Sequence, residues 1–589
     1  MNLFSRSCLV TILVPLGLFA QSVPEKPPCE LLSGLDPFKA NRFDVPPTQA
    51  KFVRLEVAGD NNQPCIDELE IFGTAPDKNL ALASNGAKVT ASSCLTGYPD
   101  SHRIEFLNDG LYGNEHSWIP AETPGWITLE LPSVTTVASI VLSRDRERKL
   151  SDRGLASFSI KTSLDGQRWT LLKQVRVLNA STVMNGFLMT FDPKALRNAA
   201  KAMTDKHPGF KLPDSFEKRL AAYEQGLQSV LDGLAKEPAS ESFRKATQLS
   251  AEMQAFQREV LLTNPDIDFD QLLLIRRKAA PQSLVKRGYH DNLGLPVNFC
   301  GNSCINPVGW DNEIATLSLR DGQWKTVYRP STPAIVSEFD LHFNAKTMLF
   351  ASAGSDNRWQ LFEMQIDGSG LRQVSTGALG DVDNYDPMYL PDGRIIFNSS
   401  ASFAGVPCFG GTDYVANLHL MNADGTGIRR LTYEQDNDWH PTMLPNGRVL
   451  YLRWEYTDTA HYFSRILMQM NPDGTGQTAL YGSNSYWPNT MFFPKPLPGS
   501  SSKFVAIVSG HHGTCRAGEL FLFDAAKGQQ ETNGVLQRVA PALATPSTMG
   551  QIKDVLVDAS WPKFLQPYPI SDQAFLVSCQ LAPRSTWGL

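Results

Sequence analysis

The chain has 589 residues, a net charge of -6 and a sequence pI near 6.0. It has no long run of Lys or Arg to form the basic surface that DNA or RNA binding needs, so nucleic-acid partners are excluded. A single hydrophobic core is excluded at this length, and we expect three or four domains.

The first twenty residues have the pattern of a secretory signal peptide. Arg6 precedes the apolar run Cys8–Ala20, which ends at a small residue suited to cleavage. This run is too short for a membrane span, which takes about 20 apolar residues. We therefore predict a signal peptide at 1–20, an extension at 21–49, no membrane span and a secreted or periplasmic protein.

Residues 50–195 have the alternating pattern of short strands in a β-sandwich. Val53, Leu55 and Val57, for example, fall on one face of a strand. The stretch resembles a discoidin (factor V/VIII C-type, galactose-binding-like) domain through five motifs in that family's order: Asn79–Ala83, Val89–Ser93, Leu107–Gly110, Trp126–Leu131 and Ser163–Trp169.

Two segments are out of that order. Lys51–Leu55 and Asp67–Gly73 resemble the family's closing strands, yet they precede its opening. A circularly permuted sandwich explains them, because chain ends that are close in space tolerate such a cut. The alternative is the tail of a degenerate preceding copy. Phe191–Pro193 leads into a helix instead of another closing strand, which favours permutation.

The discoidin resemblance implies a structural calcium ion. Asp109, Asn114 and Ser117 follow the family's loop pattern, and Glu68 is the expected distant carboxylate. Calcium prefers several oxygen ligands of these kinds. The alternative is an Asp-Gly turn with capping side chains.

The same resemblance implies a glycan or cell-surface ligand, bound by loops at one end of the sandwich. The candidate ligand-binding residues are His102, His116 and Trp118, with Tyr98 nearby. Trp118 could instead anchor the core.

Residues 196–285 predict a helical connector. Two runs of apolar residues with helical spacing predict an antiparallel hairpin, and Asn264-Pro265 ends the second. The first run is Phe216, Leu220, Tyr223, Leu227, Val230 and Leu234, and the second is Phe243, Leu249, Met253, Phe256 and Val260.

Residues 286–589 contain an internal repeat. Asp386–Phe397 recurs as His440–Tyr451, and Gln365–Arg372 recurs as Asn422–Thr432 and Asn471–Gly476. The Asp-Gly-Thr-Gly turn in the second element resembles a TolB-like blade, a four-stranded sheet that packs radially with others. We therefore predict a mainly β chain that ends in a β-propeller of about six blades.

The ends of this propeller are predicted from the repeat register. The first blade should contain the strands between Glu313 and Tyr328. Ala574–Cys579 repeats the first half of a blade, and Trp587–Leu589 begins the next strand. The last blade should therefore be incomplete, truncated by one or two outer strands.

Longer stretches resemble the middle domain of hydrazine synthase alpha subunits. They are Asp381–Asp386, Gly405–Cys408, Arg453–Asp458, Tyr481–Asn489 and Gly510–Gly513. This resemblance suggests other secreted subunits as partners. Because the chain has no Cys-x-x-Cys-His motif, we expect no covalently attached haem.

His511, His512 and Cys515 are the candidate transition-metal ligands of the propeller, since all three fall within five residues. The alternative is that the histidines hydrogen-bond within a turn while Cys515 forms a disulfide with Cys408 or another cysteine. Glu455 and Asp458 could serve as acid and base, or they could tie down blade loops.

Two classes of function remain. One is a non-catalytic binding protein, with a glycan or surface ligand on the sandwich and a partner or ligand on the propeller. The other is a metal- or cofactor-dependent subunit of a hydrazine-synthase-like assembly. The chain has no nucleophile or phosphate-loop motif, so no catalytic residue is assigned and calcium is the one expected cofactor.

Overall fold

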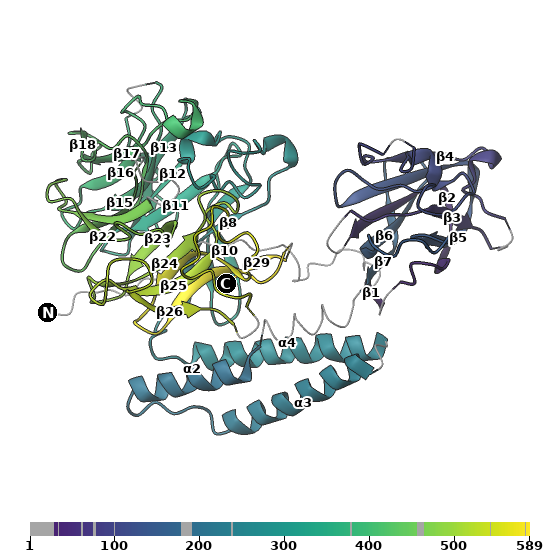
Figure 1. The fold of residues 1–589 in the computed structure, drawn as a ribbon, viewed down its shortest axis with the longest axis horizontal. Helices are drawn as coiled ribbons and strands as arrows, with labels where there is room; N and C mark the ends of the chain where they lie inside the picture. Colours follow the sequence, from purple (N-terminus) through teal and green to yellow (C-terminus); the bar gives the residue numbers. More distant parts are fainter. Residues whose placement is uncertain are drawn as a thin grey trace. The chain divides into compact units, whose positions relative to one another are not determined.

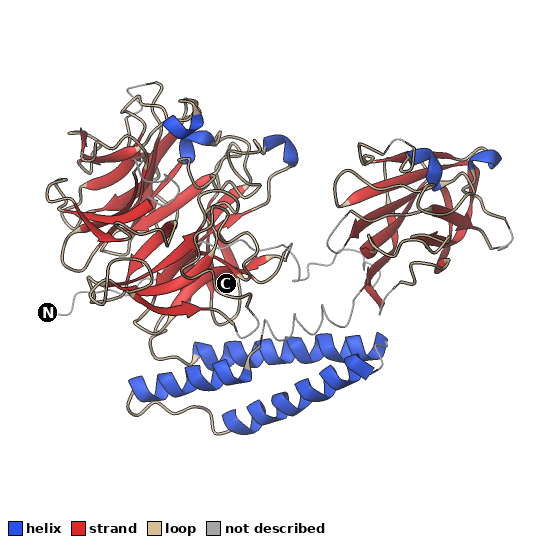
Figure 2. Ribbon diagram, viewed as in Figure 1, coloured by secondary structure: helices blue, strands red, loops and turns tan. Residues whose placement is uncertain are grey.

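The computed structural model describes residues 29–32, 35–59, 63–74, 78–98, 100–177, 191–236, 240–376, 380–455, 465–541, 544–583 and 585–589. The predicted signal peptide lies outside these ranges. The chain forms two units. The propeller unit contains Lys194–Leu212 and Gln257–Leu589. The sandwich unit contains the described residues up to Pro193, together with Pro213–Phe256. Figures 1 and 2 draw the elements of both units. No helix within the described ranges is long and apolar enough to cross a membrane.

The sandwich unit contains one mixed sheet that folds over on itself. The strand order is β1-β7-β6-β2-β5-β3, and β4 pairs with β5. The strands are β1 (Cys29–Leu32), β2 (Asn41–Gly59), β3 (Glu68–Phe72), β4 (Lys88–Ala91), β5 (Gly125–Ser143), β6 (Leu155–Ser163) and β7 (Thr170–Val177).

Two long strands let this sheet form two layers. Register shifts in the middle of β2 divide its pairing with β5 into two stretches. Bulges of this kind bend a strand. Phe43 from the first half of β2 and Leu55 from the second therefore share one core with Ile140 of β5.

The two segments that resemble closing strands belong to this same sheet. Lys51–Leu55 lies within β2, which pairs with both β5 and β6. Glu68–Phe72 forms β3, which pairs with β5. Both segments are therefore strands of the same sheet as the motifs that follow them.

The predicted helical hairpin is present, and a third helix precedes it. The helices are α2 (Pro193–Lys206), α3 (Phe216–Lys236) and α4 (Ser240–Leu262). In the sandwich unit, Phe216 stacks on Phe256 with ring centroids 6.0 Å apart, and Gly226 lies against Leu249. These contacts run in opposite directions along the two helices, so α3 and α4 are antiparallel.

The propeller unit contains six sheets in chain order, which confirms the predicted six blades. The four central sheets have four strands each, while the first and last have three. Blade 1 is β8 (Gln271–Arg277), β9 (Asn312–Ser318) and β10 (Trp324–Tyr328); blade 2 is β11 (Val336–Leu341), β12 (Thr347–Ala353), β13 (Trp359–Gln365) and β14 (Arg372–Gln373); blade 3 is β15 (Asn384–Tyr389), β16 (Ile395–Ser399), β17 (Asn417–Met421) and β18 (Arg429–Arg430); blade 4 is β19 (Asp438–Met443), β20 (Val449–Trp454), β21 (Arg465–Met470) and β22 (Thr478–Tyr481); blade 5 is β23 (Thr490–Pro496), β24 (Lys503–Ser509), β25 (Glu519–Asp524) and β26 (Val535–Val539); blade 6 is β27 (Lys563–Pro569), β28 (Phe575–Gln580) and β29 (Trp587–Gly588).

Strand β8 corrects the predicted boundary at residue 286. This strand falls within the stretch assigned to the helical connector, yet it pairs with β9 along its whole length. Leu272 and Leu274 pack toward blade 6, and Leu273 and Ile275 pack toward blade 2. The alternating sides of β8 therefore close the ring between the last blade and the second.

The backbone conformation of the repeated turn explains why its glycine recurs in each copy. Gly368, Gly425 and Gly474 have φ values of +91°, +85° and +86°, which other residues rarely adopt. A Cβ at Gly425 would lie 2.2 Å from the backbone oxygen of Val374 in the preceding blade. The turn therefore docks on the neighbouring blade.

Candidate functional site

A long segment between β8 and β9 covers one mouth of the ring. We call residues 288–311 the plug. The plug reaches blade 2, where Trp359 Nε1 donates to Ile305 O at 2.9 Å, and blade 3, where the Phe299 and Phe409 rings are 5.3 Å apart. It reaches blade 5 through Asn298 Nδ2, which donates to Gly510 O at 2.8 Å. Contacts with blades on opposite sides place the plug across the ring.

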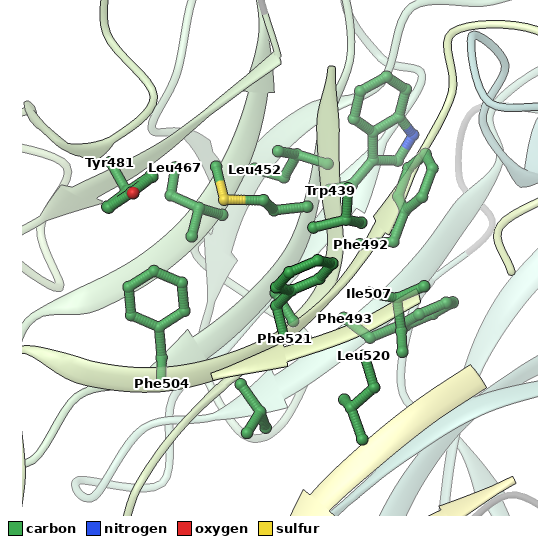
Figure 3. Packing of buried hydrophobic residues seen from close by; sticks show 14 of the residues in the cluster. Trp439, Leu452, Leu467, Tyr481, Phe492, Phe493, Phe504, Ile507, Leu520 and Phe521 are labelled. Atoms are coloured by element: carbon green, nitrogen blue, oxygen red, sulfur yellow. The ribbon is translucent and has the colours of Figure 1, made fainter. Parts of the chain in front are cut away.

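The plug is part of the largest hydrophobic core of the propeller. Its Leu295, Phe299 and Cys300 pack with side chains of blades 4 and 5. Figure 3 shows part of this core, including Trp439, Phe492 and Phe521. The plug is therefore anchored by apolar packing, and it can form the wall of a site.

A pocket of about 230 Å³ lies between the plug, the loop after β24 and blade 6. These segments are far apart in the sequence, and they bring charged, aromatic and thiol groups together. The lining residues are Asp291, Asn292, Leu293, Leu295, Thr514, Cys515, Ala517, Asp558, Trp561, Lys563, Gln580 and Trp587.

Three charged groups dominate the electrostatics of the pocket. Asp291 accepts backbone N–H bonds from Leu293 at 2.8 Å and Leu295 at 2.9 Å, and burial raises its pKa to about 6. Burial lowers the pKa of Lys563 to about 8. Asp558 accepts from the Thr514 N–H at 2.8 Å. The lining therefore contains two carboxyl groups and one amino group, and the charge of the buried Arg277 opposes the effect of burial on the pKa of Asp291.

Of these lining residues, Cys515 alone is a candidate predicted from the sequence. No local pattern predicted Asp291, Asp558, Trp561, Lys563 or Trp587. The polar stretch Tyr289–Asn292 before the predicted first blade was the available signal, because polar residues between strands often form binding loops.

His511 and His512 lie beside Phe299 of the plug. His511 is fully buried, with its ring 5.7 Å from Phe299 and 5.6 Å from Trp454. His512 Nδ1 lies 2.9 Å from Asp554. Among the described residues, no group of three or more His, Cys, Asp or Glu side chains is placed to hold a metal ion.

The described cysteines, Cys515 among them, are free thiols. The side chain of Cys408, the predicted partner of Cys515 in one alternative, lies outside the described residues.

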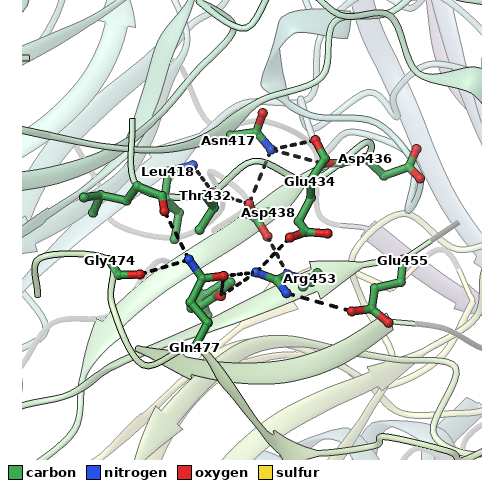
Figure 4. Close-up of polar contacts among 12 residues, drawn as sticks. Asn417, Leu418, Thr432, Glu434, Asp436, Asp438, Arg453, Glu455, Gly474 and Gln477 are labelled. Atoms are coloured by element: carbon green, nitrogen blue, oxygen red, sulfur yellow. Dashed lines mark hydrogen bonds and ion pairs between the residues drawn. The ribbon is translucent and has the colours of Figure 1, made fainter. Parts of the chain in front are cut away.

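A buried ion network surrounds Arg453 in blade 4 (Figure 4). Its guanidinium lies 3.2 Å from Glu434, 3.6 Å from Asp438 and 3.9 Å from Glu455. Burial raises the pKa of Asp438 to about 6, and this carboxyl is completely buried. Glu455 therefore contributes to a structural network, while Asp458 lies outside the described residues.

The predicted calcium residues divide into two groups in the sandwich unit. Glu68 is completely buried, and its pKa rises to about 9 through burial and the charge of Asp109. Two facing carboxyls of this kind fit a hard cation; Asp109 Oδ2 also lies 3.1 Å from His116 Nδ1. The side chain of Asn114 fits less well, since its Oδ1 accepts from Arg144, and Ser117 Oγ donates to the backbone oxygen of Asn114.

The predicted ligand-binding residues differ in how far their side chains are buried. Trp118 is completely buried in the sandwich core and donates to Ser93 O at 2.9 Å, which corrects its assignment to a ligand platform. His102 is nearly buried and hydrogen-bonds Ser117 Oγ at 2.9 Å. His116 is partly exposed beside Asp109, at 3.1 Å. Tyr98, 56% exposed, lies next to His102.

No protein-family model and no curated protein matches the chain. Among solved structures, the hydrazine synthase of Kuenenia stuttgartiensis matches at 17% identity and a TM-score of 0.40, over 54% of this chain and 42% of that chain. A TolB of Agrobacterium tumefaciens matches at 20% identity and a TM-score of 0.24, over 29% and 57%. The propeller resembles those of TolB and hydrazine synthase.

A TolB of Acinetobacter baumannii matches at 13% identity and a TM-score of 0.26, over 36% of this chain and 46% of that one. The chain thus spans less than two thirds of the length of each of these three chains. At such identities the likeness concerns the fold. The ligand of the TolB-like propeller has to be argued from its own residues.

Proposed function

We propose that the chain is an exported binding protein that holds a small organic cation in the pocket beneath its plug. The charge of the pocket lining carries the proposal. Among the lining residues, two carboxyl groups, those of Asp291 and Asp558, face one amino group, that of Lys563, and the buried Arg277 outside the lining also interacts with Asp291. The excess of acidic groups on the lining itself suits a cationic ligand. Trp587 adds an indole group, whose face attracts cations, while the Trp561 ring already has Lys563 Nζ 4.9 Å from its centre.

The size of the pocket restricts the ligand. A volume of about 230 Å³ is below the usual range of roughly 300–1,000 Å³ for sites that hold drug-sized molecules. A compact ammonium compound such as choline is a suitable probe. Its neutral isostere, 3,3-dimethylbutan-1-ol, has nearly the same shape and lacks the charge.

Choline should raise the melting temperature of the full chain at pH 7, and the neutral isostere should raise it much less. Asp291→Asn keeps an oxygen acceptor for the two backbone N–H groups but removes the charge, so choline affinity should fall about tenfold. Because the pKa of Asp291 is about 6, wild-type affinity should also fall between pH 7 and pH 5. Calorimetric titration at both pH values measures these changes.

The matched control is Asp321→Asn, which removes an exposed carboxylate from blade 1. This variant should bind choline as the wild type does. Equal affinity for choline and its neutral isostere, or unchanged affinity in Asp291→Asn, would contradict a cation site.

The N-terminal sandwich is the proposed attachment module. Its sequence resembles discoidin domains, which supports a glycan or cell-surface ligand, and the two carboxyls Glu68 and Asp109 support a bound calcium ion. With Trp118 in the core, Tyr98 and His116 remain as the accessible aromatic side chains of the predicted loops.

Tyr98→Ala should reduce binding of the protein to a glycan microarray by about tenfold, because sugars stack on exposed aromatic rings. Leu164→Ala is the control, since Leu164 is 60% exposed, close to the 56% of Tyr98. If Tyr98→Ala binds as strongly as wild type while Leu164→Ala loses binding, the glycan surface lies elsewhere on the sandwich.

A further inference from the structure

Each inner strand from blade 2 to blade 6 contains a bulge at the same place. The register shifts once in β11, β15, β19, β23 and β27. At four of these bulges the residue before a proline is left-handed, with φ of +55° at Asp386, +53° at His440, +51° at Phe493 and +48° at Gln566. Such a conformation costs about 1–3 kcal/mol for a residue other than glycine. A bulge redirects a side chain.

The redirected side chains meet one another around the axis of the ring. Together with Glu338 from the bulge of β11, we call them the axial belt: Glu338, Asp386, His440, Phe493 and Gln566. Asp386 Oδ2 accepts from the His440 N–H at 2.6 Å and lies 3.2 Å from His440 Nδ1. The ring of His440 lies 4.2 Å from that of Phe493. Gln566 Nε2 donates to Glu338 Oε1 at 3.0 Å, from blade 6 to blade 2.

Two buried arginines lie on the plug side of the belt. Arg516 donates to Cys300 O of the plug, and its guanidinium lies 4.3 Å from the ring centre of Phe492 and 4.9 Å from that of Trp439. Its charge interacts with Glu338 and Asp386. Arg277 Nη2 lies 3.8 Å from Glu338. The belt and the arginines thus bring two carboxyl groups and two guanidinium groups together, with the charge of Lys495 also acting on Asp386 and that of Asp291 on Arg277.

Several polar atoms of this cluster lack a hydrogen-bond partner within the described part of the chain. They are Arg516 Nε and Nη1, Arg277 Nε, Gln566 Oε1 and His440 Nε2. Arg516, Arg277 and Gln566 are each more than nine-tenths buried. Buried polar atoms are nearly always paired with protein, ordered water or a bound species, so unpaired atoms that gather around Glu338 mark a place where such a partner fits.

The unpaired atoms indicate which hydrogen-bonding groups a bound molecule needs. The arginines offer donors on the plug side. If the His440 Nδ1–H faces Asp386, Nε2 is an acceptor, as is Gln566 Oε1, and both lie beside the carboxylates of Glu338 and Asp386. The bound molecule thus needs an anionic acceptor group at one end and a cationic donor group at the other. A zwitterion carries both groups.

We propose that the axial belt and Arg516 bind a small zwitterion of the amino-acid type, with its carboxylate at Arg516 and its ammonium among Glu338, His440 and Gln566. The side chain of Glu338 is 22% exposed, so solvent reaches the belt at this residue. Arg277 lies between this site and the pocket, since it interacts with both Glu338 and Asp291, but amino-acid binding at the belt does not depend on the proposed choline binding.

The test is a thermal-shift and saturation-transfer NMR screen of the full chain with the common amino acids, followed by the hydroxy acid and the amine that correspond to the best one. An amino acid should bind, and both analogues should bind at least tenfold more weakly. Gln566→Met, which removes one acceptor, should weaken amino-acid binding about tenfold. Gln373→Met is the control on an exposed outer strand and should change nothing.

The NMR measurement reads ligand contact directly, so it remains valid if Gln566→Met lowers the melting temperature. Binding of the hydroxy acid or the amine as strongly as the amino acid would overturn the zwitterion assignment. The absence of any amino-acid response would mean that ordered water alone pairs the cluster, and it would overturn the site. Either result leaves choline binding at Asp291 unaffected, so the two proposals fail independently.

Discussion

Arg453→Met should destabilise the propeller by about 3–5 kcal/mol at pH 7, the usual effect of removing one partner from a buried ion network. Methionine preserves much of the side-chain volume but leaves Asp438, which is completely buried, beside Glu434 without a cation. Scanning calorimetry of the full chain should show one transition at a much lower temperature and the other unchanged.

The pH dependence of this loss identifies its cause. Burial raises the pKa of Asp438 to about 6 even beside Arg453, and the pKa will rise further without that cation. A carboxyl with a raised pKa stabilises the fold when protonated, so the loss in Arg453→Met should shrink as the pH falls from 7 to 5. Arg429→Met, on an exposed outer strand, is the control and should melt as the wild type does. A loss that is the same at both pH values would point to packing instead of charge.

Glu68→Gln should stabilise the calcium-free sandwich at pH 7 by about 3 kcal/mol. The pKa of Glu68 is about 9 in the fold against a reference of 4.5, because the carboxyl is buried and faces Asp109. The stability that this group contributes is complete below pH 4.5 and is lost as the pH rises through 9. Each pH unit above the reference pKa costs about 1.4 kcal/mol. Because pH 7 is about 2.5 units above that pKa, the loss there is about 3 kcal/mol.

Calcium should make the wild-type sandwich more stable than Glu68→Gln. The ion requires an ionised carboxylate, so it should raise the melting temperature of the wild-type sandwich and release a proton at pH 7. Glu68→Gln and Asp109→Asn should both lose that response. Melting curves with calcium and with a chelator, between pH 5 and pH 9, measure the effect. An equal calcium response in wild type and Glu68→Gln would show that the ion binds elsewhere.

The architecture of the propeller could be predicted because its signals are local and repeated. Asp386–Phe397 and His440–Tyr451 each contain an inner strand, a turn and the next strand, so one blade predicts the others. The spacing of apolar residues likewise predicted α3 and α4, since the helical period is present within a single turn or two. The discoidin resemblance of the sandwich stays a prediction, although its two misplaced segments proved to be strands of one sheet.

The functional candidates depended on contacts that no local pattern contains. Strand β8 is buried on both faces, so its continuous apolar run Leu272–Ile275 lacks the alternation that marks a half-buried strand. The pocket brings Asp291 and Lys563 together where the first and last blades meet, and the axial belt joins Glu338 to Gln566. By itself, the sequence determined the blades, because each blade is built from neighbouring residues. Only the tertiary structure decided which side chains converge, because ring closure brings together groups from opposite ends of the propeller.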